Sequence, residues 1–149
     1  MTAGTALNGA MAATIEDVMI PNPTALPASA TINAAARAMR DEAIGAVVVL
    51  ENSRLRGILT DRDIVVRVVA GGLPADRTTV GEICSTDLTT VSRTDDLEEA
   101  ATLMRDRGLR RLPVVDHGTV VGILSLGDVA REQEPDSALA RISSAPPNR

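Results

Sequence analysis

The chain is built on an internal repeat. The segment at 57–63, with the sequence GILTDRD, returns 65 residues later at 122–128 as GILSLGD. With that same offset the stretches 14–63 and 79–128 align without a gap, and about a dozen of the aligned pairs are identical. Self-similarity of this kind is typical of a duplicated supersecondary unit. The sequence therefore predicts two copies of one small fold in tandem.

The repeat also divides the chain into domains. We expect a disordered arm at 1–13, a first repeat at 14–70, a linker at 71–78, a second repeat at 79–132 and a flexible tail at 133–149. The arm is rich in Ala, Gly and Thr, and the tail in Pro, Ser and Ala, which supply little surface for a core. A repeat of this length buries only a marginal core by itself, so the two copies are expected to share an interface.

Hydrophobic periodicity predicts the same elements in both copies: a short turn, a strand, a helix, a hairpin of two strands and a second helix. In the first copy these elements are expected at 14–19, 24–26, 31–43, 46–50 with 54–59, and 61–70. In the second copy the hairpin is expected at 112–115 with 119–124, and the last helix at 126–132. The fold class is therefore α+β, and we expect the two sheets to pack face to face, because each has an apolar side to cover.

The long helix of each copy has one apolar face. Residues at helical spacing define it, namely Ile32, Ala35, Ala36, Met39 and Ala43 in the first copy and Leu97, Ala100, Ala101 and Met104 in the second. Asp95 and Glu98 are expected to cap the start of the second of these helices, and Gly108 to end it. These residues are assigned to the core and to the helix ends.

Composition excludes several functions. The net charge is −5 and every basic side chain is Arg, which argues against duplex nucleic acid as a partner. Phe, Tyr and Trp are absent, so a bound flat ring would lie between aliphatic side chains. No apolar run approaches the roughly 20 residues of a membrane span. Because there is also one cysteine and no secretion signal, we expect a cytoplasmic protein.

Catalytic and metal sites are not indicated. The chain has one His and one Cys, too few for the usual metal-ligand sets, and no nucleophile is paired with a base. His117 is expected in an exposed turn. Cys84 is expected to be a small buried residue whose thiol pKa is raised by Glu82 and Asp87 nearby. We therefore expect no enzyme activity.

The repeated pattern, Gly-aliphatic-aliphatic-Thr/Ser-x-x-Asp after a strand and before a helix, resembles that of the cystathionine β-synthase (CBS) domain. Two such domains in tandem resemble a Bateman module, and the resemblance covers about residues 14–132. It implies an adenosine-containing ligand, such as AMP, ADP, ATP or S-adenosylmethionine, in the cleft between the repeats. It also implies a homodimer that regulates an attached or associated effector protein.

The ligand-binding residues that this resemblance implies form one set in each repeat. Asp63 and Asp128 would accept hydrogen bonds from ribose hydroxyls. Thr60 and Ser125, with the help of Arg62, would contact phosphate. The base would lie against strand residues, which are Leu26, Ala46 and Val47 in the first set and Val91, Leu112 and Pro113 in the second.

A structural role explains the same motif equally well. Thr60 with Asp63, and Ser125 with Asp128, have the spacing of helix capping boxes, which satisfy free N–H groups at a helix start. Two hypotheses therefore remain open. The first is a free-standing regulatory module that binds an adenosyl ligand. The alternative is a structural or interaction protein of the same fold that binds no small ligand.

Overall fold

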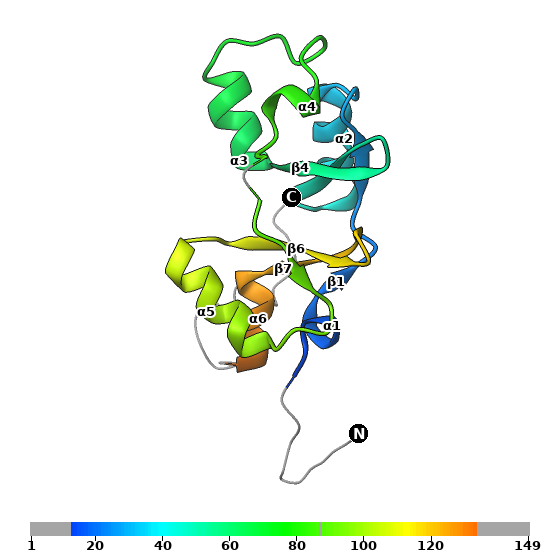
Figure 1. Cartoon of the computed structure of the whole chain (residues 1–149). Helices are drawn as coiled ribbons and strands as arrows, with labels where there is room; N and C mark the ends of the chain where they lie inside the picture. Colours follow the sequence, from blue (N-terminus) through cyan, green and yellow to red (C-terminus); the bar gives the residue numbers. More distant parts are fainter. Residues whose placement is uncertain (1–12, 87, 134–149) are drawn as a thin grey trace, which may run out of the picture. The chain divides into compact units, whose positions relative to one another are not determined.

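The computed structural model describes residues 13–86 and 88–133, and these form two compact units (Figure 1). Unit 1 takes residues 13–21, 90–116 and 121–133, and unit 2 takes 22–86, 88–89 and 117–120. Each unit has one sheet with helices against it, which confirms the α+β class. The predicted arm and tail lie outside the described residues, apart from Ala13 and Gln133.

Unit 2 is built on a three-stranded sheet in the order β2-β3-β4. Strand β2 (Ala25–Pro27) runs parallel to β3 (Ala46–Glu51), and β3 pairs antiparallel with β4 (Arg54–Thr60). Helix α2 (Ile32–Glu42) makes the crossover between the two parallel strands. Its side chains pack with those of the strands in one core, which includes Ile32, Ala35, Met39, Val47, Val49 and Leu59.

Unit 1 repeats this plan with one more strand. Its sheet has the order β1-β7-β6-β5, with β1 at Ile20–Pro21, β5 at Val91–Ser92, β6 at Arg111–Asp116 and β7 at Thr119–Ser125. Strands β5 and β6 are parallel and are joined by α5 (Leu97–Arg107). Helix α6 (Leu126–Gln133) follows β7, as predicted. The core includes Leu97, Ala100, Ala101, Met104, Leu112 and Leu124.

The opening segments of the two repeats are exchanged between the units. The first repeat opens with α1 (Ile15–Val18) and β1, yet both belong to unit 1, where Ile20 pairs with Ile123 of β7. The second repeat opens with α4 (Val80–Ile83), which belongs to unit 2, where Ser85 bridges to Ile58 of β4. Each unit therefore consists of the body of one repeat and the opening of the other.

Two details of the helix predictions were wrong. Ala36 was assigned to the apolar face of α2 but is exposed, because the core takes Ile32, Ala35 and Met39.

The cap of α5 is Asp96, whose carboxylate accepts from the N–H of Glu98 at 3.1 Å. Asp95 instead accepts from the N–H of Ser92, because it lies in the turn before the helix. Gly108 ends α5 with φ of 64°, as predicted.

The second helix of unit 2 is part α-helix and part π-helix. It begins as α3 (Asp61–Asp63) and continues as a π-helix, η1 (Ile64–Val69). In its last part the N–H of Ala70 donates to the carbonyl of Val65 at 2.9 Å, five residues back. The matching helix of unit 1, α6, is α-helical throughout. The predicted helix at 61–70 is therefore present, but the two repeats differ in its geometry.

Candidate functional site

The first motif closes into a capping box at the end of β4. The Thr60 hydroxyl accepts from the N–H of Asp63 at 3.1 Å, and the Asp63 carboxylate accepts from the N–H of Thr60 at 2.9 Å. The strand thereby delivers Thr60 directly to the start of α3. Both side chains satisfy backbone groups of the helix start, as the structural interpretation of the motif predicts. The Thr60 O–H and the second Asp63 oxygen are not used in this box.

The second motif makes the same two bonds. The Ser125 hydroxyl accepts from the N–H of Asp128, and the Asp128 carboxylate accepts from the N–H of Ser125, both at 3.1 Å. The other Asp128 oxygen accepts from the Arg131 guanidinium, one turn further along α6. Only 2% of the Asp128 side chain is exposed. Both oxygens of the Asp128 carboxylate therefore already accept hydrogen bonds from residues of unit 1.

The two carboxylates differ in how accessible they are. The Asp63 side chain is 18% exposed, and its second oxygen lies 4.0 Å from Nε of Arg67. Arg67 is held from the other side, because it donates to the carbonyl of Ile83 at 2.8 Å. A carboxylate has about four acceptor positions, so Asp63 retains capacity for a further donor. The first motif is therefore the more open of the two.

Arg67 and Arg131 were not among the predicted site residues. Each contacts the motif carboxylate of its own helix, from position i+4 in the first motif and i+3 in the second. A helix places residues at these spacings on one face, so the Asp–Arg spacing is a sequence signal that would have identified both arginines.

Arg62 has a different environment. It is exposed, and its backbone N–H donates to the Asp61 carboxylate at 2.8 Å. Within the described residues its guanidinium is in no ion pair of the kind that fixes Arg67. Arg62 can therefore turn toward an anion near Thr60 without breaking an existing contact.

The residues that were predicted to contact the base differ in how deeply they are buried. Ala46 pairs with Thr60 across β3 and β4 and is half-buried, so these two residues do lie together. Leu26 is half-buried against the core of unit 2. Val47 and Leu112 are fully buried in the cores of their units, and Val91 and Pro113 are also buried. The structure thus brings Thr60, Asp63 and Ala46 together, but it does not bring Val47 or Leu112 to a surface.

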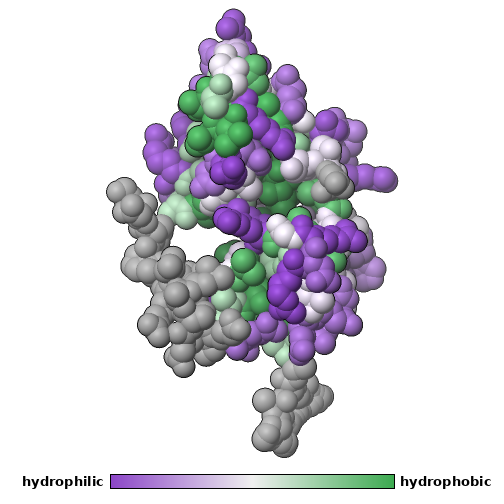
Figure 2. All heavy atoms as spheres, turned by 90° about the vertical axis from the view of Figure 1, so that its left-hand side faces the viewer, coloured by the Kyte–Doolittle hydropathy of each residue, from purple (hydrophilic) through white to green (hydrophobic). Residues whose placement is uncertain are grey.

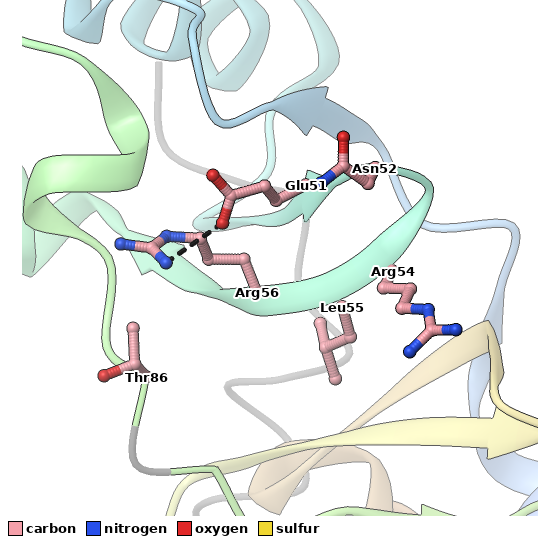
Figure 3. A pocket seen from close by; sticks show the side chains of 6 residues that line it. All are labelled: Glu51, Asn52, Arg54, Leu55, Arg56 and Thr86. Carbon is pink, nitrogen blue, oxygen red and sulfur yellow. Dashed lines mark hydrogen bonds and ion pairs between the residues drawn. The ribbon is translucent and has the colours of Figure 1, made fainter.

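A separate hollow lies at the other end of the β3–β4 hairpin (Figure 3). It has a volume of about 680 Å³ and is lined by Glu51, Asn52, Arg54, Leu55, Arg56 and Thr86. The Arg56 guanidinium donates to the Glu51 carboxylate at 3.1 Å, as the dashed line in the figure marks, and to the carbonyl of Gly81 at 3.3 Å. Arg56 thereby joins the hairpin to α4. None of the predicted site residues lines this hollow.

The environments of Cys84 and His117 agree with expectation, with one correction. Cys84 is 6% exposed, and its thiol pKa is raised. The main cause is burial, which disfavours the thiolate; Glu82 is not among the causes, and Asp87 lies outside the described residues. His117 is exposed in the turn between β6 and β7 and has φ of 51°. Across 13–86 and 88–133, no three His, Cys, Asp or Glu side chains are grouped to hold a metal ion.

Comparison with known proteins adds evidence of ancestry. A family model described as the CBS domain matches residues 15–70 and 80–134, the two halves of the internal repeat. The CBS domain-containing protein YhcV of Bacillus subtilis (strain 168) is 39% identical over 133 residues, which are 87% of this chain and 94% of that protein. In the described part of the chain, no helix has the length and apolar character needed to cross a membrane.

Two solved structures are similar in fold as well as in sequence. The crystal structure of Hypoxic Response Protein I with two coordinated zinc ions is 35% identical, with a TM-score of 0.71, and the match covers 80% of this chain and 98% of that one. The crystal structure of CBSX2 in complex with AMP is 26% identical, with a TM-score of 0.68, and the match covers 80% of this chain and 94% of that one.

Proposed function

This chain belongs to the CBS domain family as a tandem pair, and from that premise we propose that it is a regulatory module that binds an adenine nucleotide at the Thr60–Asp63 motif. The observation that carries the proposal is the Asp63 carboxylate, which is 18% exposed and keeps acceptor capacity, while the neighbouring residue Arg62 is in no ion pair within the described residues. A carboxylate can accept hydrogen bonds from both hydroxyls of a ribose, and an arginine can bind phosphate. The AMP complex of the related CBSX2 supports this ligand class.

The contacts of the unliganded motif fit this role. The Thr60 hydroxyl accepts from the N–H of Asp63, which leaves its own O–H free to donate to a phosphate oxygen. The second oxygen of Asp63 lies 4.0 Å from Nε of Arg67, and 18% of the Asp63 side chain is exposed. Ala46, opposite Thr60 on β3, offers a small apolar surface for the base. We place the nucleotide at this motif and not at Asp128, whose two oxygens already have partners.

The family resemblance extends the proposal to the module's surroundings. We propose that it acts in the cytoplasm as a homodimer and that nucleotide occupancy changes its contact with an effector protein. The single cysteine, which rules out an internal disulfide, supports a reducing compartment.

Two asparagine variants separate ligand binding from capping. In Asp63→Asn the side-chain carbonyl still accepts from the N–H of Thr60, but the carboxylate is lost. We expect AMP affinity to fall about 10- to 100-fold, with little change in melting temperature. Asp128→Asn should do the reverse, because it removes the negative charge with which the buried Asp128 pairs with Arg131, in a motif without ligand. Isothermal titration with AMP and thermal unfolding measure the two effects.

A second function is favoured by one observation. Both motifs are complete capping boxes, so stability alone accounts for their residues. In that case the chain is a structural or interaction protein without a small ligand. Saturating AMP, ATP or S-adenosylmethionine would then leave the melting temperature of the wild-type protein unchanged, whereas a ligand of the native state must raise it.

A further inference from the structure

The hollow at the end of the β3–β4 hairpin is a charged surface to which the nucleotide motif gives no role (Figure 3). Of the six residues that line it, Leu55 is the one apolar residue, and Glu51, Arg54 and Arg56 are charged. Two arginines against one glutamate leave one surplus positive charge, although the whole chain has a net charge of −5. A complementary ligand would therefore carry charges of both signs, with one negative charge in excess.

The exposed apolar side chains in the described part of unit 2 lie outside this hollow. Val65, Val66 and Val69 of η1 are 58%, 48% and 70% exposed, and Leu73, just after the helix, is 44% exposed. Figure 2 shows apolar atoms gathered on the side of the molecule where this helix lies. The hollow at the hairpin has a different character, because hydrogen-bonding side chains surround a single leucine. A ligand there must be held mainly by charges and hydrogen bonds.

The ion pair between Glu51 and Arg56 forms one end of the hollow. Arg56 donates to the Glu51 carboxylate at 3.1 Å and to the carbonyl of Gly81 at 3.3 Å. A guanidinium has five N–H donors and a carboxylate about four acceptor positions, so both groups keep capacity for a ligand. Their side chains are 54% exposed in Glu51 and 38% exposed in Arg56. The ammonium and carboxylate of an α-amino acid are two such charges side by side, and they match Glu51 and Arg56.

Arg54 forms the other end of the hollow. In Figure 3 its guanidinium points away from the ion pair, and Leu55 lies between the two ends. Arg54 is exposed, and within the described residues it is in no ion pair. An arginine in this position can bind a carboxylate through two N–H groups. A ligand that spans both ends therefore has an amino-acid head, a short aliphatic stem over Leu55 and a terminal carboxylate.

The corresponding hairpin of unit 1 lacks both arginines. Thr119 and Val121 stand at the positions of Arg54 and Arg56. The acidic residue at the end of β6 is paired instead with Arg93, which follows β5. The shared fold therefore forms without arginines at these two positions, and the charged hollow belongs to the first repeat.

We propose that this hollow binds a free acidic α-amino acid, for which L-glutamate is the probe. Its volume of about 680 Å³ is within the range of small-molecule sites. Six residues of β4 separate Arg54 from Thr60, which is roughly 20 Å of extended strand. The hollow and the nucleotide motif share no residue, so this inference goes beyond the proposed function and does not depend on it.

Three related ligands test the proposal on the full chain. L-glutamate should bind about 10-fold more tightly than L-glutamine, which lacks the terminal charge, and than glutarate, which lacks the ammonium group. Isothermal titration measures the three affinities, and saturating L-glutamate should raise the melting temperature. Equal affinity for glutarate and L-glutamate would show a surface that binds any anion and would overturn the proposal. Neither heat of binding nor a rise in melting temperature with L-glutamate would also overturn it.

Charge variants assign each end of the ligand. Arg54→Gln should lower the affinity for L-glutamate about 10-fold and leave that for L-glutamine unchanged. Glu51→Gln should abolish the preference for L-glutamate over glutarate, while its side-chain carbonyl still accepts from Arg56. Arg37→Gln is the matched control, because Arg37 is an exposed arginine on α2 that does not line the hollow.

The control variant decides between the hollow and the net charge of the chain. Arg37→Gln should bind L-glutamate as wild type does, and all three variants should unfold at temperatures close to that of wild type. An equal loss of affinity in Arg37→Gln and Arg54→Gln would show that net charge and not the hollow attracts the ligand. An L-glutamate affinity unchanged by Arg54→Gln would likewise refute the site.

Titration with both ligands keeps this site apart from the nucleotide motif. L-glutamate should leave the affinity for AMP unchanged, and displacement of AMP by L-glutamate would contradict a separate site. A chain that binds L-glutamate but not AMP would refute the proposed nucleotide and leave the hollow supported. A chain that binds AMP but not L-glutamate would refute the hollow alone.

Discussion

At the residue scale, the glycine that begins each repeated motif has a steric role. A Cβ built on Gly57 would lie 2.2 Å from the carbonyl oxygen of Ser85, and one built on Gly122 would lie 2.4 Å from the sulfur of Met19. Both contacts come from the exchanged opening segment that crosses the motif strand. Real Cβ atoms do not approach other atoms so closely, so a side chain at either position would force the exchanged segment to shift.

The two glycines should differ in how they tolerate alanine. Gly57→Ala meets a backbone oxygen, so we expect a loss of unfolding free energy of roughly 1–3 kcal/mol, the usual range for overpacking. Gly122→Ala first meets the Met19 side chain, which is flexible, and should cost less. Urea unfolding of each variant measures both values.

Removal of the neighbouring side chain provides the control. Met19→Ala should recover part of the stability lost in Gly122→Ala, beyond the sum of the single changes. Cys84→Ala should not rescue Gly57→Ala, because the Ser85 oxygen remains in place. If Cys84→Ala rescues Gly57→Ala as Met19→Ala rescues Gly122→Ala, then side chains, and not the Ser85 backbone oxygen, cause the loss of stability.

At the scale of elements, an arginine fixes α1 to unit 1. The Arg93 guanidinium donates to both carboxylate oxygens of Glu16 at 3.0 Å, and its Nε lies 3.0 Å from the Asp116 carboxylate. Asp116 and then Glu16 raise the pKa of Arg93, which reflects how closely the two carboxylates approach its guanidinium. In unit 2, Arg56 joins Glu51, which aligns with Asp116, to the carbonyl of Gly81 in α4. Each exchanged opening is therefore held by an arginine and an acidic residue at the end of a strand.

Loss of Arg93 should loosen α1 before it unfolds the unit. We expect Arg93→Leu to accelerate amide hydrogen exchange in 14–19 by several-fold, because exposed ion pairs contribute modestly to global stability but order the segment they hold. Exchange in α5 should stay unchanged. Arg40→Leu is the matched control, since within the described residues Arg40 forms its ion pair with its neighbour Asp41 at the surface. An equal effect of both variants on 14–19 would show that Arg93 does not hold α1.

At the scale of the whole molecule, the exchange makes the two repeats dependent on one another. Unit 1 needs 13–21 from the first repeat, and unit 2 needs α4 from the second. A separated repeat therefore lacks an opening strand or helix and exposes the edge that it covers.

Cutting the linker tests this dependence. We expect residues 1–72 and 73–149 to be largely unfolded when expressed alone, and to regain native helix content when mixed in equal amounts. Circular dichroism of the halves and of the mixture measures the effect. Native-like spectra of either half alone would show that the exchanged openings are dispensable. The uncut chain is the reference for full helix content.

The sequence by itself determined the duplication, the order of the longer helices and strands and both capping boxes, because these depend on periodicity and on residues three or four positions apart. It did not predict the two-residue strand β1, which forms by pairing with the distant β7. It also placed His117 in a turn and Cys84 in the core. It predicted the wrong cap for α5, since Asp95 and Asp96 have similar capping ability and the adjacent turn selects between them.

Only the tertiary structure decided which repeat contributes which opening, which motif carboxylate stays accessible and which helix carries an exposed apolar face. Asp63 and Asp128 occupy the same position in the repeat, yet they differ in exposure because Arg131 approaches one much more closely than Arg67 approaches the other. The steric role of Gly57 and Gly122 comes from their contacts with Ser85 and Met19, which are distant in sequence. Such properties follow from contacts between remote segments, and local sequence patterns do not encode them.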